Sequence, residues 1–195
     1  ATPRLKRFRK RGAGAETWSA LVAVAGQLNG SGAHAVGRPA FLGDALLRAL
    51  VDEARRQLPE RLGKRRATGA AGDTLAAVAV SRQLRDVVSG ALGFPVAPTH
   101  EALYEYDPPG SHVATHLDSR DYPIVFHLLL EHTRSNEATA ESVLIAHLPG
   151  SPTPTRLRLR RGEGLVLRGR GTIHSWQPLG DDEQRILLAV GFAPE

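Results

Sequence analysis

The chain has no cysteine among its 195 residues. This absence excludes disulfide bonds and thiolate metal sites, so a bound metal would have to be held by imidazole and carboxylate groups. Those ligands suit iron, zinc, manganese or copper. The candidates are therefore found among eight histidines and twenty acidic residues.

The sequence also lacks a long apolar run. No stretch approaches the roughly 18 apolar residues that a membrane span needs, and the first residues are charged rather than the start of an apolar signal segment. We therefore expect a soluble, cytoplasmic protein with no membrane partner. A length of 195 residues, 42% of them hydrophobic, suits one sizeable core, so we predict a single domain over residues 1–195.

Positive charge is in mild excess, with a formal net charge of +5. Such an excess favours anionic partners at low salt. The basic run at residues 4–11 is either a solvated tail or a contact for nucleic acid. In Arg156, Arg158 and Arg160, strict alternation with leucine places three guanidinium groups on one strand face, which is either a solvated outer face or an anion-binding groove.

The amino-terminal part, residues 1–99, reads as mainly helical support. An amphipathic stripe starting at Asp44 and stopping before Pro59 predicts one helix. Ser81 is placed to cap a second helix that Gly93 would end. A shorter helix is expected around residues 16–28.

From residue 100 the pattern changes to short β-type segments separated by glycine, proline and aspartate turns. Eight such segments predict an α+β fold, with a double-stranded β-helix (a jelly roll, cupin-like) over residues 100–195 and the amino-terminal helices packed on one sheet. The predicted strands are 101–106, 112–117, 123–130, 142–148, 155–160, 164–167, 172–177 and 184–192.

Three side chains form a candidate metal site. His116 and Asp118 are separated by one residue, and on a strand that spacing directs both side chains to the same face. His174 lies on a later predicted strand. Two imidazoles and one carboxylate on one face of an octahedral metal leave the opposite face open, an arrangement typical of oxygen-activating iron(II). Each residue alone would be an ordinary structural histidine or surface acid; the joint pattern carries the prediction.

Arg185 is the fourth element. On the last predicted strand it alternates with Leu187 and Ala189 on one face, while Ile186 and Leu188 lie on the other. One face of such a strand lines the barrel interior. An inward guanidinium is costly without an anion, and its planar fork matches a carboxylate, so a dicarboxylate ligand is expected.

With these residues in place, the segment from Tyr104 to Phe192 resembles the iron(II)- and 2-oxoglutarate-dependent dioxygenase superfamily, in its prolyl-hydroxylase-like branch. The sequence Tyr-Asp-Pro-Pro-Gly at residues 106–110 is similar to that branch's entry turn, and residues 161–167 are similar to the glycine-rich turn that precedes its distal histidine. The resemblance implies that iron(II) is bound by the two histidines and the aspartate, and that Arg185 binds the far carboxylate of 2-oxoglutarate.

Two further residues follow from the resemblance. Tyr106 is expected to hydrogen-bond the co-substrate. His127 stands where several relatives place a tyrosine or another polar contact to 2-oxoglutarate, and it is either a ligand-facing residue or a core histidine with its hydrogen bonds satisfied. Trp176 shares a strand face with His174 and is either part of the pocket wall or core.

The activity implied is that of an enzyme, a dioxygenase that uses O2 and 2-oxoglutarate to hydroxylate an unactivated carbon of a small molecule, an amino acid, or a peptidyl or carrier-bound unit. Asp118 favours hydroxylation, because halogenating relatives lack this carboxylate. A nucleic-acid dealkylase is a second hypothesis; such enzymes usually carry another arginine six residues after the first, where this chain has Gly191. A non-catalytic cupin-like binding module is the third.

Overall fold

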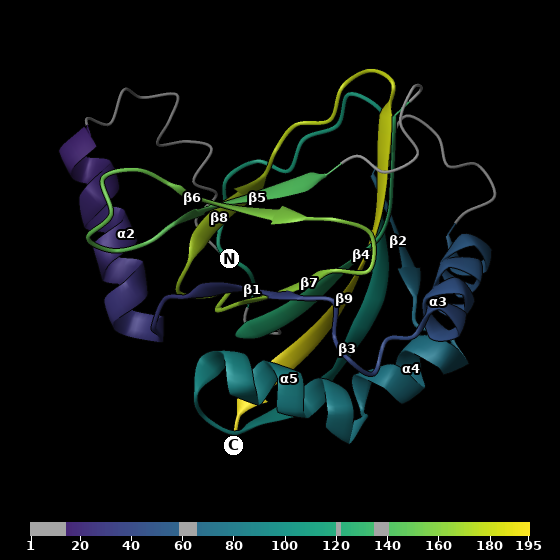
Figure 1. Cartoon of the computed structure of the whole chain (residues 1–195). Helices are drawn as coiled ribbons and strands as arrows, with labels where there is room; N and C mark the ends of the chain where they lie inside the picture. The colour runs from purple at the N-terminus through teal and green to yellow at the C-terminus, as the bar shows by residue number, and fades with distance from the viewer. Residues whose placement is uncertain (1–14, 59–65, 120–121, 135–140) are drawn as a thin grey trace.

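Two antiparallel β-sheets face each other in the computed structural model, which describes residues 15–58, 66–119, 122–134 and 141–195. Figure 1 shows the larger sheet on the right and the smaller one above and to the left. The larger sheet has the order β1-β7-β4-β9-β3-β2, with strands Ala33–Gly37, Gly164–Leu167, Ile124–Arg134, Glu183–Pro194, Val96–Asp107 and Ala67–Ala70. The smaller sheet has the order β6-β5-β8, with strands Thr155–Leu159, Ser142–His147 and Ile173–Trp176.

Strand β9 divides the protein into two cores, as its alternation predicts. Leu187 and Ala189 belong to the cluster between the two sheets, together with Trp176 of β8. Ile186 and Leu188 belong to the larger cluster beneath the helices. The predicted double-stranded β-helix is therefore confirmed, and the side of β9 that carries Arg185 faces the space between the sheets.

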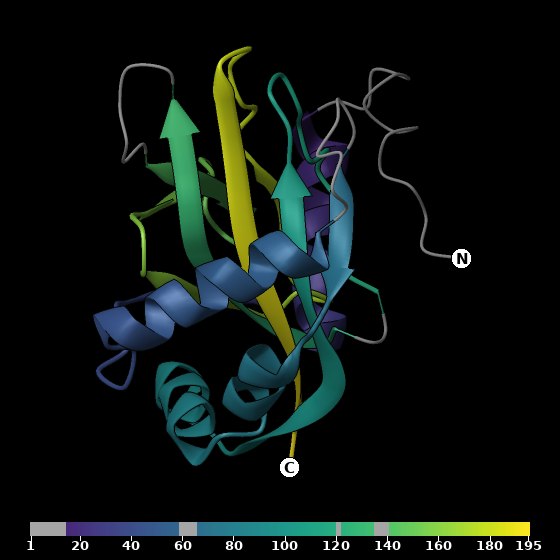
Figure 2. The same cartoon turned by 90° about the vertical axis from the view of Figure 1, so that its right-hand side faces the viewer.

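Three helices cover the outer face of the larger sheet, as Figure 2 shows. They are α3 (Asp44–Gln57), α4 (Asp73–Ala79) and α5 (Arg82–Leu92). Ser81 caps α5 by accepting a hydrogen bond from the Leu84 amide, and Gly93 ends the helix with a positive φ of 76°. Both caps are as predicted.

A buried carboxylate fixes these helices to the sheet. Glu53 of α3 accepts hydrogen bonds from the amides of Thr74 and Leu75 at 2.8 and 2.9 Å, which caps the first turn of α4. The Tyr104 hydroxyl of β3 donates to the same carboxylate at 2.7 Å. Glu53 is 4% exposed, and these bonds lower its pKa to about 2 although desolvation acts in the opposite direction.

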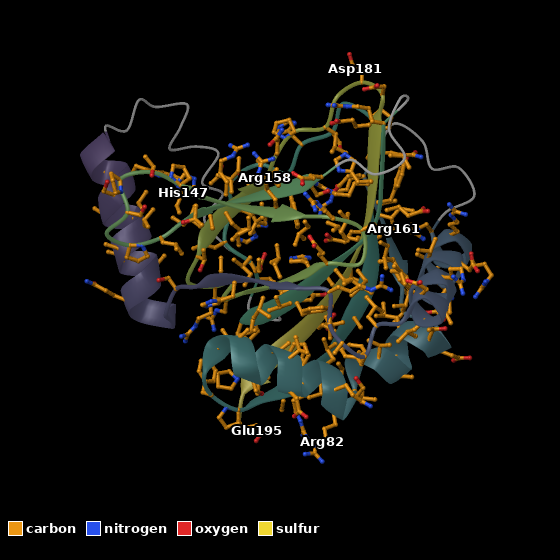
Figure 3. The ribbon with its side chains drawn as sticks, in the orientation of Figure 1. Arg82, His147, Arg158, Arg161, Asp181 and Glu195 are labelled. Atoms are coloured by element: carbon orange, nitrogen blue, oxygen red, sulfur yellow. The ribbon has the colours of Figure 1, made fainter. Side chains whose placement is uncertain are left out.

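The first helix departs from the prediction that all amino-terminal helices pack on one sheet. Helix α2 (Ala15–Asn29) lies beside the smaller sheet, where Val22 and Ala25 pack against Ile173 of β8. The Trp18 indole also donates to His147 of β5 at 3.4 Å. Figure 3 shows His147 on the side of the sheet that faces α2. The apolar residues of α2 are spread around the helix rather than gathered on one face. The sequence therefore did not indicate which surface this helix would cover.

Seven of the eight predicted strands are present, and the segment 112–117 is the exception. It joins the fold through one isolated bridge between His116 and His174. Strands β1 and β2 and helix α4 were not predicted, because each is short and rich in alanine and so lacks a clear apolar pattern. The basic run at residues 4–11 lies outside the described residues. No described helix has both the length and the apolar character needed to cross a membrane.

Candidate metal and co-substrate site

The three predicted metal ligands come together at one point between the sheets. Ligand atoms of His116, Asp118 and His174 all lie within 4.8 Å of one another. His116 Nε2 is 3.3 Å and His174 Nε2 is 3.5 Å from Asp118 Oδ1. The distances allow all three side chains to bind a single ion.

Backbone pairing brings the ligands together without a full strand. The His116 amide donates to the His174 carbonyl at 2.8 Å, and the His174 amide donates back at 2.9 Å. Two residues further on, the Asp118 amide donates to the Gly169 carbonyl at 3.0 Å. These three bonds hold residues 116–118 against β8 and the turn before it, so the expected convergence arises although residues 112–117 are not a strand.

Each histidine is oriented through its second ring nitrogen. His116 Nδ1 lies 2.8 Å from the Ala114 carbonyl, and His174 Nδ1 lies 2.9 Å from the Thr172 carbonyl. Because a carbonyl only accepts, both Nδ1 atoms are the donors, which leaves the Nε2 lone pairs directed at Asp118 and available to a metal.

The charges at the site suit a cation. Desolvation lowers the pKa of His174 to about 4, so its imidazole is neutral at ordinary pH. Desolvation acts to raise the pKa of the Asp118 carboxyl, but the neighbouring His174 and His116 outweigh this effect and lower that pKa. Its Oδ2 atom is buried and has no hydrogen-bond partner among the described residues. An unpaired buried carboxylate oxygen beside two imidazole lone pairs is the donor set that a divalent metal requires.

Arg185 faces the interior as expected, but its partner is a residue of the chain itself. The guanidinium Nε and Nη2 donate to Asp107 Oδ2 at 3.0 and 2.6 Å, and the cation lies 4.5 Å from the ring centroid of Trp176. Arg185 Nη1 is buried without a partner in the described structure. The arginine is thus held on one edge and available on the other.

Asp107 belongs to a short chain of charges that the sequence interpretation missed. Its Oδ1 lies 3.0 Å from Arg66 Nε, and Arg66 Nη2 donates to Glu105 at 2.9 Å. The i, i+2 spacing of two acids on β3, opposite the arginine strand, was the signal that could have found them. Two acids and two arginines therefore form one charged group around Asp107.

His127 lies on the interior face of β4, where it is the cross-strand partner of Ala189. Its ring packs edge-on against Trp176 at 5.7 Å, and desolvation lowers its pKa to about 4. The Nδ1 atom is buried with no partner among the residues described. Of the two alternatives left open by the sequence, this unpaired nitrogen favours a ligand-facing histidine.

Tyr106 does not occupy the place expected for it. Its neighbours on β3, Glu105 and Asp107, face the interior, so alternation directs Tyr106 to the helix-covered core. There its hydroxyl donates to Gln184 at 3.1 Å. A tyrosine on the outer face of the sheet points away from the space between the sheets, so the geometry gives no support to the expected contact between Tyr106 and the co-substrate.

A second interior histidine, His132, was not predicted. A bulge between Leu129 and Glu131 reverses the facing of β4, which places His132 opposite Arg185. His132 Nδ1 lies 2.9 Å from the Ser142 hydroxyl, and its Nε2 is buried without a described partner. A cavity of about 310 Å³ is lined by both His132 and Arg185. Sequence alternation alone could not reveal the bulge.

Comparison with known proteins gives a consistent result at the level of fold. No protein-family model and no curated protein matches the chain. Among solved structures, HygX from Streptomyces hygroscopicus with nickel, 2-oxoglutarate and hygromycin B bound is 18% identical, with 84% of this chain and 83% of that chain covered and a TM-score of 0.61. The epimerase SnoN from nogalamycin biosynthesis, described as non-heme and alpha-ketoglutarate-dependent, is 16% identical over 92% and 84% of the two chains, with a TM-score of 0.61.

A Pseudomonas putida prolyl-4-hydroxylase is also similar, at 20% identity, with 91% of this chain and 99% of that chain covered and a TM-score of 0.55. The chain therefore shares its fold with these solved structures, and the predicted jelly-roll fold is confirmed.

Proposed function

We propose that this protein is an iron(II)- and 2-oxoglutarate-dependent dioxygenase in which His116, Asp118 and His174 bind the iron. The observation that carries the proposal is the meeting of these three ligand atoms within 4.8 Å. The three ligands supply two neutral donors and one charge, and leave coordination positions for a co-substrate. Iron held there would supply the activation of O2, coupled to decarboxylation of 2-oxoglutarate to succinate and CO2.

The chain's own residues bind and orient the co-substrate. Arg185 offers its unpaired Nη1 to the distal carboxylate, while Trp176 packs against the guanidinium and limits its rotation. His127 offers a neutral ring nitrogen on the interior face of β4. Closely packed leucines and valines between the sheets exclude water from the remaining space.

The proposed reaction is hydroxylation of an unactivated carbon in a small molecule or in an amino acid, free or on a peptide or carrier. The structural relatives support this breadth, since one is a prolyl hydroxylase and another was crystallised with hygromycin B. An epimerase is also among them, so stereochemical inversion at carbon is the second outcome to assay.

The two rival functions are less well supported. A second arginine at position 191, as in nucleic-acid dealkylases, has no room: even a Cβ atom there would overlap the Thr99 hydroxyl and press on Glu101 and Tyr122. A metal-binding module without catalysis gives no reason for a buried arginine with one free edge beside the site.

Anaerobic titration tests the proposal. Protein loaded with iron(II) should develop the weak visible charge-transfer band on addition of 2-oxoglutarate, and His174→Ala should abolish it. His34→Ala, which removes an exposed histidine from β1, is the matched control and should keep the band. Zinc retention without a band would favour the binding module.

A succinate-release screen then tests turnover, against amino acids, peptides, aminoglycosides and methylated oligonucleotides. His116→Ala is the blank. Succinate formed at an equal rate by this variant would contradict the catalytic assignment.

A further inference from the structure

The Arg185 guanidinium already has an anionic partner within the chain. Both the arginine and Asp107 have side chains that are only 1% exposed, and their closest atoms are 2.6 Å apart. A buried guanidinium without a counter-ion is strongly unfavourable, so this pair stabilises the protein when no dicarboxylate is bound. A co-substrate carboxylate would arrive at an arginine whose charge is already partly neutralised.

The free edge of the arginine determines where a second carboxylate can bind. Asp107 Oδ2 occupies the Nε and Nη2 edge, and Nη1 has no partner among the described residues. A distal carboxylate bound at Nη1 would share one guanidinium with Asp107. The two like charges repel across a site with little water to screen them.

We propose that Asp107 is a resident competitor for Arg185, which stabilises the ligand-free protein and lowers the affinity for 2-oxoglutarate. This inference rests on the proposed function. The same competition acts on succinate, whose distal carboxylate would occupy the same edge, so Asp107 also favours release of the product.

Arg66 moderates this competition. It lies 3.0 Å from Asp107 Oδ1, and it also donates to Glu105. Its side chain is 40% exposed, unlike the fully buried Arg185. Arg66 therefore neutralises part of the Asp107 charge from the solvent side, and its loss leaves the full carboxylate charge facing Arg185 and its ligand.

Asp107→Asn separates the two effects of this carboxylate. Asparagine has one acceptor oxygen and one amide group, so it keeps a contact with only one of the two arginines. Arg66 already donates a hydrogen bond to Glu105 and is partly exposed to solvent, whereas the buried Arg185 donates its hydrogen bonds to Asp107, so the oxygen stays with Arg185. The variant thus retains the orientation of Arg185 and loses the competing charge.

The experiment is titration of anaerobic, iron(II)-loaded protein with 2-oxoglutarate, combined with thermal unfolding of the ligand-free protein. D107N should lower the Kd for 2-oxoglutarate about tenfold and also lower the unfolding midpoint; R66Q should raise the Kd about tenfold. In the D107N background the effect of R66Q should shrink, because Arg66 acts through Asp107. A residue with only a structural role would lower stability and affinity together.

Matched controls lie on the outer face of the same sheet. Glu131 of β4 lies directly opposite Ile186 of β9. Its side chain forms an ion pair with Arg55 of α3 at 2.8 Å. E131Q and R55Q make the same changes of charge as D107N and R66Q and should leave the Kd unchanged. A second control is 2-oxopentanoate, which has no distal carboxylate, so the D107N and R66Q variants should bind it as the wild type does.

Several outcomes overturn the inference. Weaker or unchanged binding of 2-oxoglutarate by folded D107N would mean that Asp107 orients the arginine or does not act on the ligand. If D107N does not fold, R66Q decides, and unchanged or tighter binding contradicts the competition. A wild type that gives no band with iron(II) and 2-oxoglutarate refutes the proposed function and this inference together, whereas a normal wild type with insensitive variants refutes the inference alone.

Discussion

Gly169 lies directly against the carboxylate of Asp118. Its carbonyl accepts the Asp118 amide at 3.0 Å, and a Cβ atom added at Gly169 would overlap Asp118 Oδ2, Cγ and Cβ. The φ of Gly169 is not positive, so an alanine meets no backbone strain there. We expect Gly169→Ala to fold and to displace the carboxylate from the metal position. Iron(II) affinity should fall about 10–100-fold, as measured by competition with a chromogenic chelator.

The control for this variant is Gly90→Ala. Gly90 lies within α5, and an added Cβ there meets nothing within 4 Å. We expect this variant to keep the wild-type iron affinity and to gain about 0.5–1 kcal/mol of stability, because alanine is the better helix former. Equal iron affinities in the two variants would show that Gly169 has no part in placing Asp118.

The candidate metal ligands could be predicted from sequence because their signal is local and chemical. His116 and Asp118 lie two residues apart, and the absence of cysteine restricts metal ligands to imidazole and carboxylate groups. The reason given for their convergence was partly wrong, since the residues are held by bridge pairing rather than by a strand. The three side chains converge nevertheless, because backbone hydrogen bonds to His174 and Gly169 hold His116 and Asp118 in place.

The surroundings of Arg185 were harder to predict, because they depend on cross-strand register. Its alternation on β9 indicated an inward guanidinium correctly, but its counter-ion, Asp107, is 78 residues away and meets it only through the pairing of β3 with β9. The position of Tyr106 on the outer face of the sheet has the same origin. The motif resemblance identified the segment around residues 106–110. Neighbouring residues of a strand face opposite sides of the sheet, so Asp107 rather than Tyr106 faces the space between the sheets.

The two tryptophans provide a direct probe of the co-substrate pocket. Trp176 lies under the Arg185 guanidinium and beside His127, whereas Trp18 lies on α2 against His147. Trp18→Phe leaves Trp176 as the only tryptophan, and its emission should change when 2-oxoglutarate binds to protein loaded with zinc, which has no redox chemistry.

The reciprocal variant, Trp176→Phe, leaves only Trp18, which lines a cavity together with Trp176 but packs against His147 rather than against Arg185, and it should show no such change. Movement of the Arg185 cation on ligand binding would change the electrostatic environment of the Trp176 indole. We therefore expect a shift or intensity change of the tryptophan emission in the Trp18→Phe variant alone. A similar response from both variants would place the ligand elsewhere or indicate a change that extends to α2.

Glu53 makes the fold sensitive to acid. Its folded-state pKa is about 2, below the ordinary value of 4.5. A lowered folded pKa means that the ionised form stabilises the protein at pH above 4.5, and that this stability is lost as the pH falls from 4.5 towards 2. The shift corresponds to about 3 kcal/mol at neutral pH.

Glu53→Gln tests this contribution. The glutamine amide cannot accept both α4 amides and the Tyr104 hydroxyl, so at pH 7 the variant should unfold in urea with a free energy lower by about 3 kcal/mol. The difference from wild type should narrow below pH 4.5 and become small near pH 2, where about half of the folded wild-type protein carries a protonated Glu53 carboxyl. Asp52→Asn, at an exposed position on the same helix, should keep the wild-type stability at every pH. A Glu53→Gln deficit that stays constant down to pH 2 would mean that shape rather than charge fixes α4 to α3.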